Sequence, residues 1–209
     1  MKFLGFAFLA AALTFCGITD RLKGLSGSSN STTTSNTSKP SDDDGQVEKA
    51  EMTSAQKAIA DGGTEIKWDA QGITFKVPSG WPKMEVRKES LNYGSPANGF
   101  LIGTISVMPA EFPMDTSIKA TYTSALEQLK QGKYEKVRML EIDGVQGVEW
   151  VEAMPEDKDG ARRHQWIGGR NYQGQNQQLN IMVSTKGTNF DKQRDAFTAI
   201  LYSMKIPKG

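Results

Sequence analysis

Alternation of apolar and polar residues predicts β-strands at two places in the chain. Residues 72–78 alternate in this way, and so do residues 177–185, where Leu179, Ile181 and Val183 share one side. Successive side chains of a strand point to opposite faces, so this pattern is typical of a strand with one buried face. We therefore expect both segments to belong to a sheet.

Residues 100–108 and 145–154 differ from these, because they are apolar on both faces. In the second segment Val148 and Trp150 face one way, and Val151 faces the other. A strand that is apolar on both sides has to be covered on both sides. The pattern therefore predicts further layers on each face of the sheet.

Short turns between these runs predict how the strands pair. Asp143-Gly144 separates the run 138–142 from the run 145–154, and Asp-Gly is a strong signal for a two-residue hairpin. Residues 155–160 form a longer polar turn that leads into the run 162–169. Strands joined by short turns pair antiparallel, so we expect a central antiparallel sheet.

Apolar stripes at helical spacing predict two helices that pack on this sheet. The first stripe consists of Ile118, Tyr122, Ala125, Leu126 and Leu129, and Gly132 ends it. The second stripe consists of Phe190, Phe197, Ile200, Leu201 and Met204, and it stops before Pro207. A third, shorter helix is expected over 53–60. Helices set between and after antiparallel strands predict an α+β layered domain.

The N-terminus has a different pattern, which is typical of an export signal. A lysine at position 2 precedes an almost uninterrupted apolar run from Phe3 to Phe15, and Cys16 follows directly. The run is shorter than the roughly 20 residues of a membrane-spanning helix. We therefore expect residues 1–15 to be a signal peptide, cleaved before Cys16, and Cys16 to carry a lipid that attaches the protein to a bacterial membrane.

Two alternatives to lipidation of Cys16 stay open at this point. Phe15 is unusual immediately before a lipidated cysteine, and Ala10-Ala11-Ala12 offers an ordinary cleavage site that would give a secreted protein. An uncleaved anchor is the second alternative. Gly17 lacks the aspartate that retains some lipoproteins in the inner membrane, which favours the outer membrane or cell surface. Because Cys16 is the only cysteine, an internal disulfide is excluded.

Composition divides the rest of the chain into a linker and a domain. Residues 16–45 are rich in Ser, Thr, Asn and Gly and end in an aspartate run, which predicts a disordered tether. Residues 46–209 have the length of a single domain. The charges of the chain nearly balance, with 25 basic and 24 acidic residues, so nothing favours nucleic acid as a partner.

The order of the predicted elements resembles the PsbP-like superfamily. The chain has the opening Gly72-Ile-Thr-Phe-Lys-Val-Pro-Ser-Gly-Trp81, a hairpin from Ile142 to Trp150, and a closing helix that leads to Ile206. It looks like the bacterial, non-photosynthetic branch, many of whose members are exported or lipid-anchored proteins of unknown role. The resemblance implies a central antiparallel sheet with helices on both faces. It also implies a binding or assembly factor without catalytic residues or a cofactor.

The residues themselves offer few candidates for chemistry, so we expect no enzyme. His164 is the only histidine, and no G-x-S-x-G nucleophile elbow accompanies it, which favours a structural or surface role. A single histidine makes a zinc enzyme improbable. Residues 157–160 lack the further acids of a calcium loop and are expected to form a turn. Glu149 and Glu152 are expected on opposite faces of one strand, at exposed or edge positions.

Four tryptophans complete the candidates. Trp150 is expected in the core and Trp81 at a sheet edge, whereas Trp68 and Trp166 are candidates for a partner surface. Taken together, the sequence predicts an exported, lipid-anchored module of the cell envelope that binds an envelope protein not identified by the sequence. The alternatives are a surface-displayed lipoprotein that acts structurally or toward a host, and a secreted hydrolase with an unrecognised site.

Overall fold

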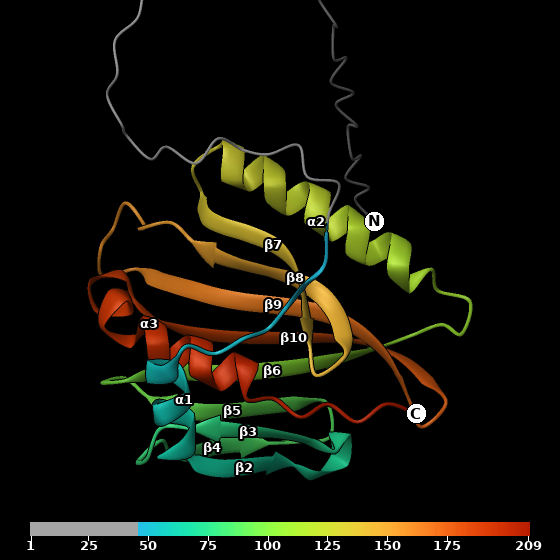
Figure 1. Ribbon diagram of the computed structural model, residues 1–209, viewed down its shortest axis with the longest axis horizontal. Helices are drawn as coiled ribbons and strands as arrows, with labels where there is room; N and C mark the ends of the chain where they lie inside the picture. Colours follow the sequence, from blue (N-terminus) through green and yellow to red (C-terminus); the bar gives the residue numbers. More distant parts are fainter. Residues whose placement is uncertain (1–45) are drawn as a thin grey trace, which may run out of the picture. The chain divides into compact units, whose positions relative to one another are not determined.

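In the computed structural model, residues 46–209 are described, and they form an α+β domain (Figure 1). Cys16, the predicted signal peptide and the predicted tether all lie outside the described residues. Those three interpretations therefore stay predictions of the sequence.

The domain is built around an eight-stranded sheet with the order β1-β7-β8-β9-β10-β6-β5-β4. All its neighbouring strands pair antiparallel except the short β1, which runs parallel to β7. The strands are β1 (Glu48–Lys49), β4 (Lys83–Val86), β5 (Ser90–Ser95), β6 (Gly99–Met108), β7 (Tyr134–Ile142), β8 (Val145–Glu152), β9 (Ala161–Tyr172) and β10 (Gln175–Lys186). The predicted central antiparallel sheet is thus confirmed, with one parallel edge strand added.

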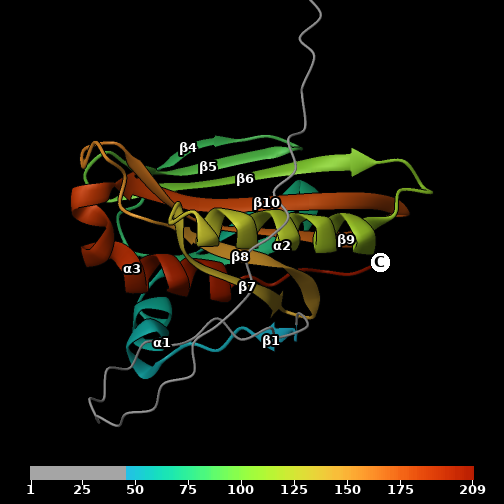
Figure 2. The same ribbon diagram turned by 90° about the horizontal axis from the view of Figure 1, so that it is seen from above.

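Helices lie on both faces of this sheet, as predicted. Helix α2 (Met114–Lys130) crosses β7, β8 and β9 on one face (Figure 2). Helix α3 (Gly187–Tyr202) packs on β9 and β10 on the other face, beside α1 (Ser54–Asp61) and a two-stranded sheet of β2 (Thr64–Trp68) and β3 (Ile73–Val77). A short 3-10 helix, η1 (Asp69–Gln71), connects β2 to β3.

Two hydrophobic cores result from this layering. The larger core, between the main sheet and the α3 layer, contains the fully buried rings of Trp68, Phe75, Trp166, Phe190 and Phe197. The smaller core lies under α2 and consists of Ile118, Ala125, Met139, Val148 and Trp150. Strand β8 contributes to both cores, which confirms that it is apolar on both faces.

The cover on the α2 face is less complete than the sequence predicts. In β6, Leu101 and Ile105 are buried in the larger core, but Phe100 and Ile102, which lie on the other face of the strand, are only half-buried. Helix α2 packs on β7, β8 and β9, so β6 lies beyond its reach (Figure 2). The expectation that this strand is covered on both sides is therefore wrong for the α2 face.

The predicted hairpin between β7 and β8 is confirmed in its position and its conformation. Asp143 and Gly144 both have positive φ angles, of 49° and 78°. Only Gly, Asn and Asp adopt this conformation readily, and it matches the twist of the flanking strands. The side chain of Asp143 also accepts a hydrogen bond of 2.7 Å from the backbone N–H of Ile206, so the same turn holds the C-terminal segment.

Candidate functional site

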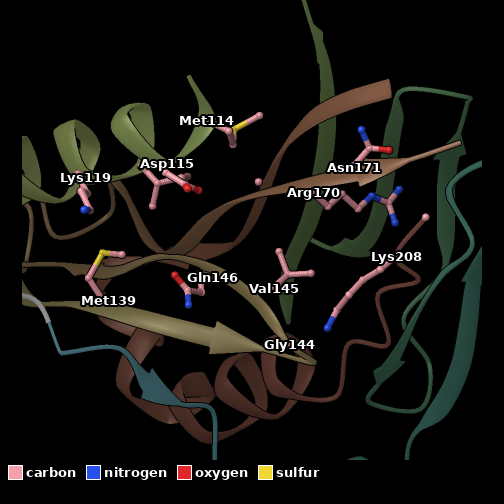
Figure 3. Close-up of a pocket in the computed structure, with 13 residues that line it drawn as sticks. Met114, Asp115, Lys119, Met139, Gly144, Val145, Gln146, Arg170, Asn171 and Lys208 are labelled. Atoms are coloured by element: carbon pink, nitrogen blue, oxygen red, sulfur yellow. The ribbon is translucent and has the colours of Figure 1, made fainter. Parts of the chain in front are cut away.

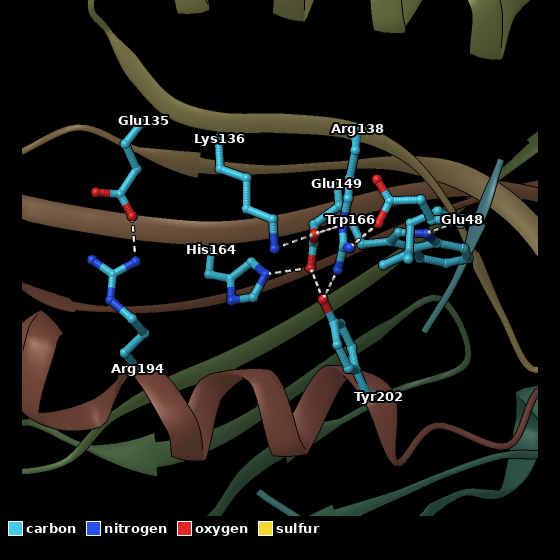
Figure 4. Close-up of polar contacts among 10 residues, drawn as sticks. Glu48, Glu135, Lys136, Arg138, Glu149, His164, Trp166, Arg194 and Tyr202 are labelled. Atoms are coloured by element: carbon cyan, nitrogen blue, oxygen red, sulfur yellow. Dashed lines mark hydrogen bonds and ion pairs between the residues drawn. The ribbon is translucent and has the colours of Figure 1, made fainter. Parts of the chain in front are cut away.

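A buried carboxylate, that of Glu149, lies at the centre of a polar network inside the domain (Figure 4). Its Oε1 atom is bonded by Tyr202 Oη at 2.6 Å and by His164 Nε2 at 2.8 Å. Its Oε2 atom accepts a hydrogen bond of 2.6 Å from Arg138 Nε and lies 3.2 Å from Lys136 Nζ. Each oxygen of the Glu149 carboxylate therefore has two polar partners.

Strand register explains why these side chains meet. Pairing of β7 with β8 sets Arg138 opposite Glu149, and pairing of β8 with β9 sets His164 opposite Val151, two residues from Glu149 on the same face. Tyr202 is the last residue of α3, and its hydroxyl also accepts a hydrogen bond from Arg138. The network thus connects three strands of the sheet to the helix that covers them.

The charge state of the network follows from burial and from its partners. Burial alone raises the pKa of Glu149, but the hydrogen bond from His164 and the charges of Lys136 and Arg138 outweigh it and hold the pKa well below its ordinary value. Burial, together with the Glu149 charge, raises the pKa of the Tyr202 hydroxyl far above 10. At neutral pH the carboxylate is ionised and the tyrosine is neutral.

A cavity of about 250 Å³ lies above this network, and its lining includes His164, Arg138, Tyr202 and Thr198. A general base needs a nitrogen or oxygen that is free to take a proton from a substrate. Glu149 already accepts bonds on both oxygens, and His164 is only 2 % exposed and uses Nε2 to bond to it. The four contacts made by the Glu149 carboxylate are typical of a structural network.

The structure corrects one sequence-based expectation about these residues and supports two others. Glu149 was expected at an exposed or edge position, and this is wrong, because the cations of β7 and the histidine of β9 compensate its charge inside the core. Glu152 does lie on the opposite face, where it pairs with Arg163 at 2.8 Å. His164 is buried, in agreement with the structural role expected for it.

The tryptophans and the acidic turn can also be placed. Trp150 and Trp81 are each 7 % exposed, so the core position expected for Trp150 is confirmed. Trp68 and Trp166 are fully buried, so their assignment to a partner surface is wrong. Residues 157–160 form a turn between β8 and β9, as expected.

A larger cleft, of about 560 Å³, opens between the start of α2 and the β7–β8 hairpin (Figure 3). Its apolar lining consists of Met114, Ile118, Met139 and Val145. Its polar lining includes Asp115 and Lys119 of α2, Gln146 of β8, Asn171 of β9 and Lys208 of the C-terminal segment. Polar and apolar groups contribute about equally to the surface of the cleft, and its volume lies within the usual range for small-molecule sites.

Local sequence explains the shape of this cleft. Gly169 of β9 has no side chain, and a Cβ atom at this position would lie 2.6 Å from Met114 Sδ. The glycine therefore lets the first turn of α2 rest on the sheet. Lys119, Lys208 and Asp115 form no ion pair within residues 46–209, so their charges remain available to a ligand.

The sequence alone did not identify this cleft. Its lining comes from four separate segments of the chain, and each of its residues is an ordinary surface or core residue in its own segment. The one local signal is the hairpin turn at Asp143-Gly144, which was predicted and which forms one end of the cleft.

The described part of the chain lacks two further kinds of feature. Among residues 46–209, no helix is long and apolar enough to cross a membrane. Within the same range, no three His, Cys, Asp or Glu side chains gather in a way that could hold a metal ion.

The structure is a layered α+β domain with a cleft at one end of α2. No protein-family model matches the sequence, and no curated protein sequence is similar to it. Solved structures similar to this one include a cyanobacterial PsbP from Synechocystis sp. PCC 6803. That protein is 15% identical over 70% of this chain and 94% of its own, with a TM-score of 0.44.

Two other solved structures resemble this fold. LpqN of Mycobacterium tuberculosis, described as involved in cell envelope biogenesis, is 14% identical over 69% of this chain and 86% of its own, with a TM-score of 0.49. A protein from Bacteroides thetaiotaomicron is 15% identical over 70% of this chain, with a TM-score of 0.46, and the match spans 49% of its length. At these identities the likeness concerns the fold, and we transfer no site or activity from it.

Proposed function

We propose that this protein is an exported, lipid-anchored binding module of the bacterial cell envelope, and that it catalyses no reaction. The observation that carries the binding role is the cleft between α2 and the β7–β8 hairpin, with its mixed polar and apolar lining and its unpaired charges. Support for the non-catalytic role comes from His164, the only histidine, which is buried and bonded to Glu149. Support for export and lipid anchoring comes from the apolar run from Phe3 to Phe15, which Cys16 follows directly.

The lipid is tested by the intact mass of the mature protein purified from its own bacterium. We expect a chain that begins at Cys16 and carries the mass of acyl groups, and we expect Cys16→Ala to release the protein from the membrane fraction. A mature chain that begins after Ala12 and carries no acyl mass would support plain secretion instead.

The binding role is tested by crosslinking in living cells. A photo-reactive amino acid at Gln146, on the rim of the cleft, is expected to give specific adducts that Lys119→Glu weakens by altering the charge of the same cleft. Lys192→Glu makes the same charge change on α3, away from the cleft, and should leave the adducts unchanged. Equal adducts in all three proteins would contradict a role for the cleft.

The non-catalytic part has its own test, because the alternative of a secreted hydrolase depends on His164. A panel of ester, amide and glycoside substrates is expected to show no turnover by the purified protein. Turnover that His164→Gln abolishes, in a variant that remains folded, would overturn this part of the proposal.

A further inference from the structure

A second groove, of about 380 Å³, runs under the middle of α2, separate from the cleft described above. From the helix it is lined by Ser117, Ala120, Thr121, Ser124, Ala125 and Gln128. These positions are spaced three or four residues apart, so they share one face of α2. Most of their side chains are small, which leaves space between the helix and the strands beneath it.

The floor of the groove is aromatic. Tyr134 of β7 and Trp150 of β8 stack with their ring centroids 5.7 Å apart and their planes inclined by 15°. Trp150 is only 7 % exposed, yet within residues 46–209 its indole N–H donates to no acceptor. The indole N–H groups of Trp68 and Trp166, by contrast, donate to backbone carbonyls at 2.7 and 3.1 Å.

The indole nitrogen of Trp150 differs from the rest of its ring, because it is not a fully buried atom. Water can therefore reach this N–H in the free protein. Trp150 lines the groove, so a ligand that offers an oxygen acceptor there would replace that water and accept the bond. The groove therefore favours a ligand with acceptors over a purely apolar one.

The lining also excludes charged ligands. Its polar groups are the hydroxyls of Ser117, Thr121, Ser124 and Tyr134, the amide of Gln128 and the indole of Trp150, and none of them is ionised at neutral pH. Burial, with a contribution from Glu152, raises the pKa of the Tyr134 hydroxyl and keeps it protonated. A charged group would lose its hydration here without gaining an ion partner.

From these properties we infer that the groove binds a neutral saccharide. A sugar ring has an apolar C–H face that suits the Tyr134 ring, and its hydroxyls both donate and accept hydrogen bonds, as do the serine and threonine hydroxyls of α2. One sugar hydroxyl accepts the bond from the indole N–H of Trp150. The volume is near the lower end of the range for small-molecule pockets, which suits a monosaccharide or a disaccharide. The inference does not depend on the charged cleft or on the lipid.

The experiment follows the four indole N–H signals of the purified full chain by ¹H–¹⁵N NMR, in a detergent without sugar groups. Maltose, cellobiose and chitobiose are the neutral probes, sialyllactose is the charged probe, and an uncharged apolar tripeptide is the competing class. We expect at least one neutral disaccharide to shift the Trp150 signal, assigned through Trp150→Phe, while the signals of the buried Trp68 and Trp166 stay in place.

Two matched variants on α2 test the location. Ser124→Leu fills the groove and should weaken binding of the saccharide by about tenfold or more. Thr123→Leu adds a similar side chain on the exposed face and should leave the affinity unchanged. The inference is overturned if none of the neutral disaccharides shifts the Trp150 signal, if only the tripeptide or sialyllactose does, or if Ser124→Leu binds as tightly as the unmodified protein.

Discussion

Replacing Glu149 with glutamine removes a buried negative charge while keeping the shape of the side chain. The carboxylate holds Arg138, His164 and Tyr202 at hydrogen-bond distance, and its own side chain is fully buried. Arg138 is also largely shielded from water, with 20% of its side chain exposed. The variant therefore leaves a guanidinium in the core whose main counter-charge is gone.

The expected loss of stability can be estimated from the cost of leaving the Arg138 guanidinium buried without its counter-charge. Removing one partner of a buried ion pair costs about 3–5 kcal/mol, because the remaining charge stays desolvated. Glu48 lies in contact with Arg138 at the surface and offsets part of this cost, so we expect a value near the lower end of that range. For a domain of this size a loss of 3 kcal/mol lowers Tm by about 6–12 °C.

The assay is urea unfolding at several pH values. The pKa of Glu149 is lowered in the folded protein from its ordinary value of 4.5, so its stabilising effect is complete above pH 4.5 and declines as the pH falls below it. The difference in unfolding free energy between the unmodified protein and Glu149→Gln should therefore be constant near neutral pH. It should shrink progressively below pH 4.5.

Glu111→Gln is the matched control, because Glu111 is exposed and forms no ion pair within the described range. Its effect should stay within about 0.5 kcal/mol. The reasoning is refuted if Glu149→Gln costs less than about 1 kcal/mol, or if its deficit is the same at pH 3 as at pH 7.

Two further predictions concern packing and capping. Gly147→Ala should lower the unfolding free energy by about 1–3 kcal/mol, because a Cβ atom at this position would lie 2.6 Å from the Trp166 ring. The control is Gly62→Ala, which should be nearly neutral, because a Cβ atom there would meet nothing closer than 3.4 Å. Thr53→Ala should cost about 1 kcal/mol and raise amide exchange in α1, since it removes the capping box with Gln56; Thr53→Ser should preserve both.

Several features of the fold were predictable because they are local. The Asp143-Gly144 hairpin, the two apolar faces of β8 and the three helices follow from turn chemistry and periodicity within short windows of sequence. Helix ends shifted by a few residues: α2 begins at Met114, and α3 ends at Tyr202. Strands β2, β4 and β5 were not predicted. Their runs are short and contain few apolar residues, so they form strands mainly because neighbouring strands pair with them.

The sequence by itself determined the apolar run before Cys16, the low-complexity stretch and the order of layers, since each depends on composition or period alone. Only the tertiary structure decided that Glu149 is buried. Its partners Arg138, His164 and Tyr202 are 11, 15 and 53 residues away, and neither spacing nor composition reveals that they meet. The cleft and the groove under α2 were also decided only by the tertiary structure. Their linings come from helix and strand segments that are far apart in the sequence, and a cavity forms only when these segments pack together.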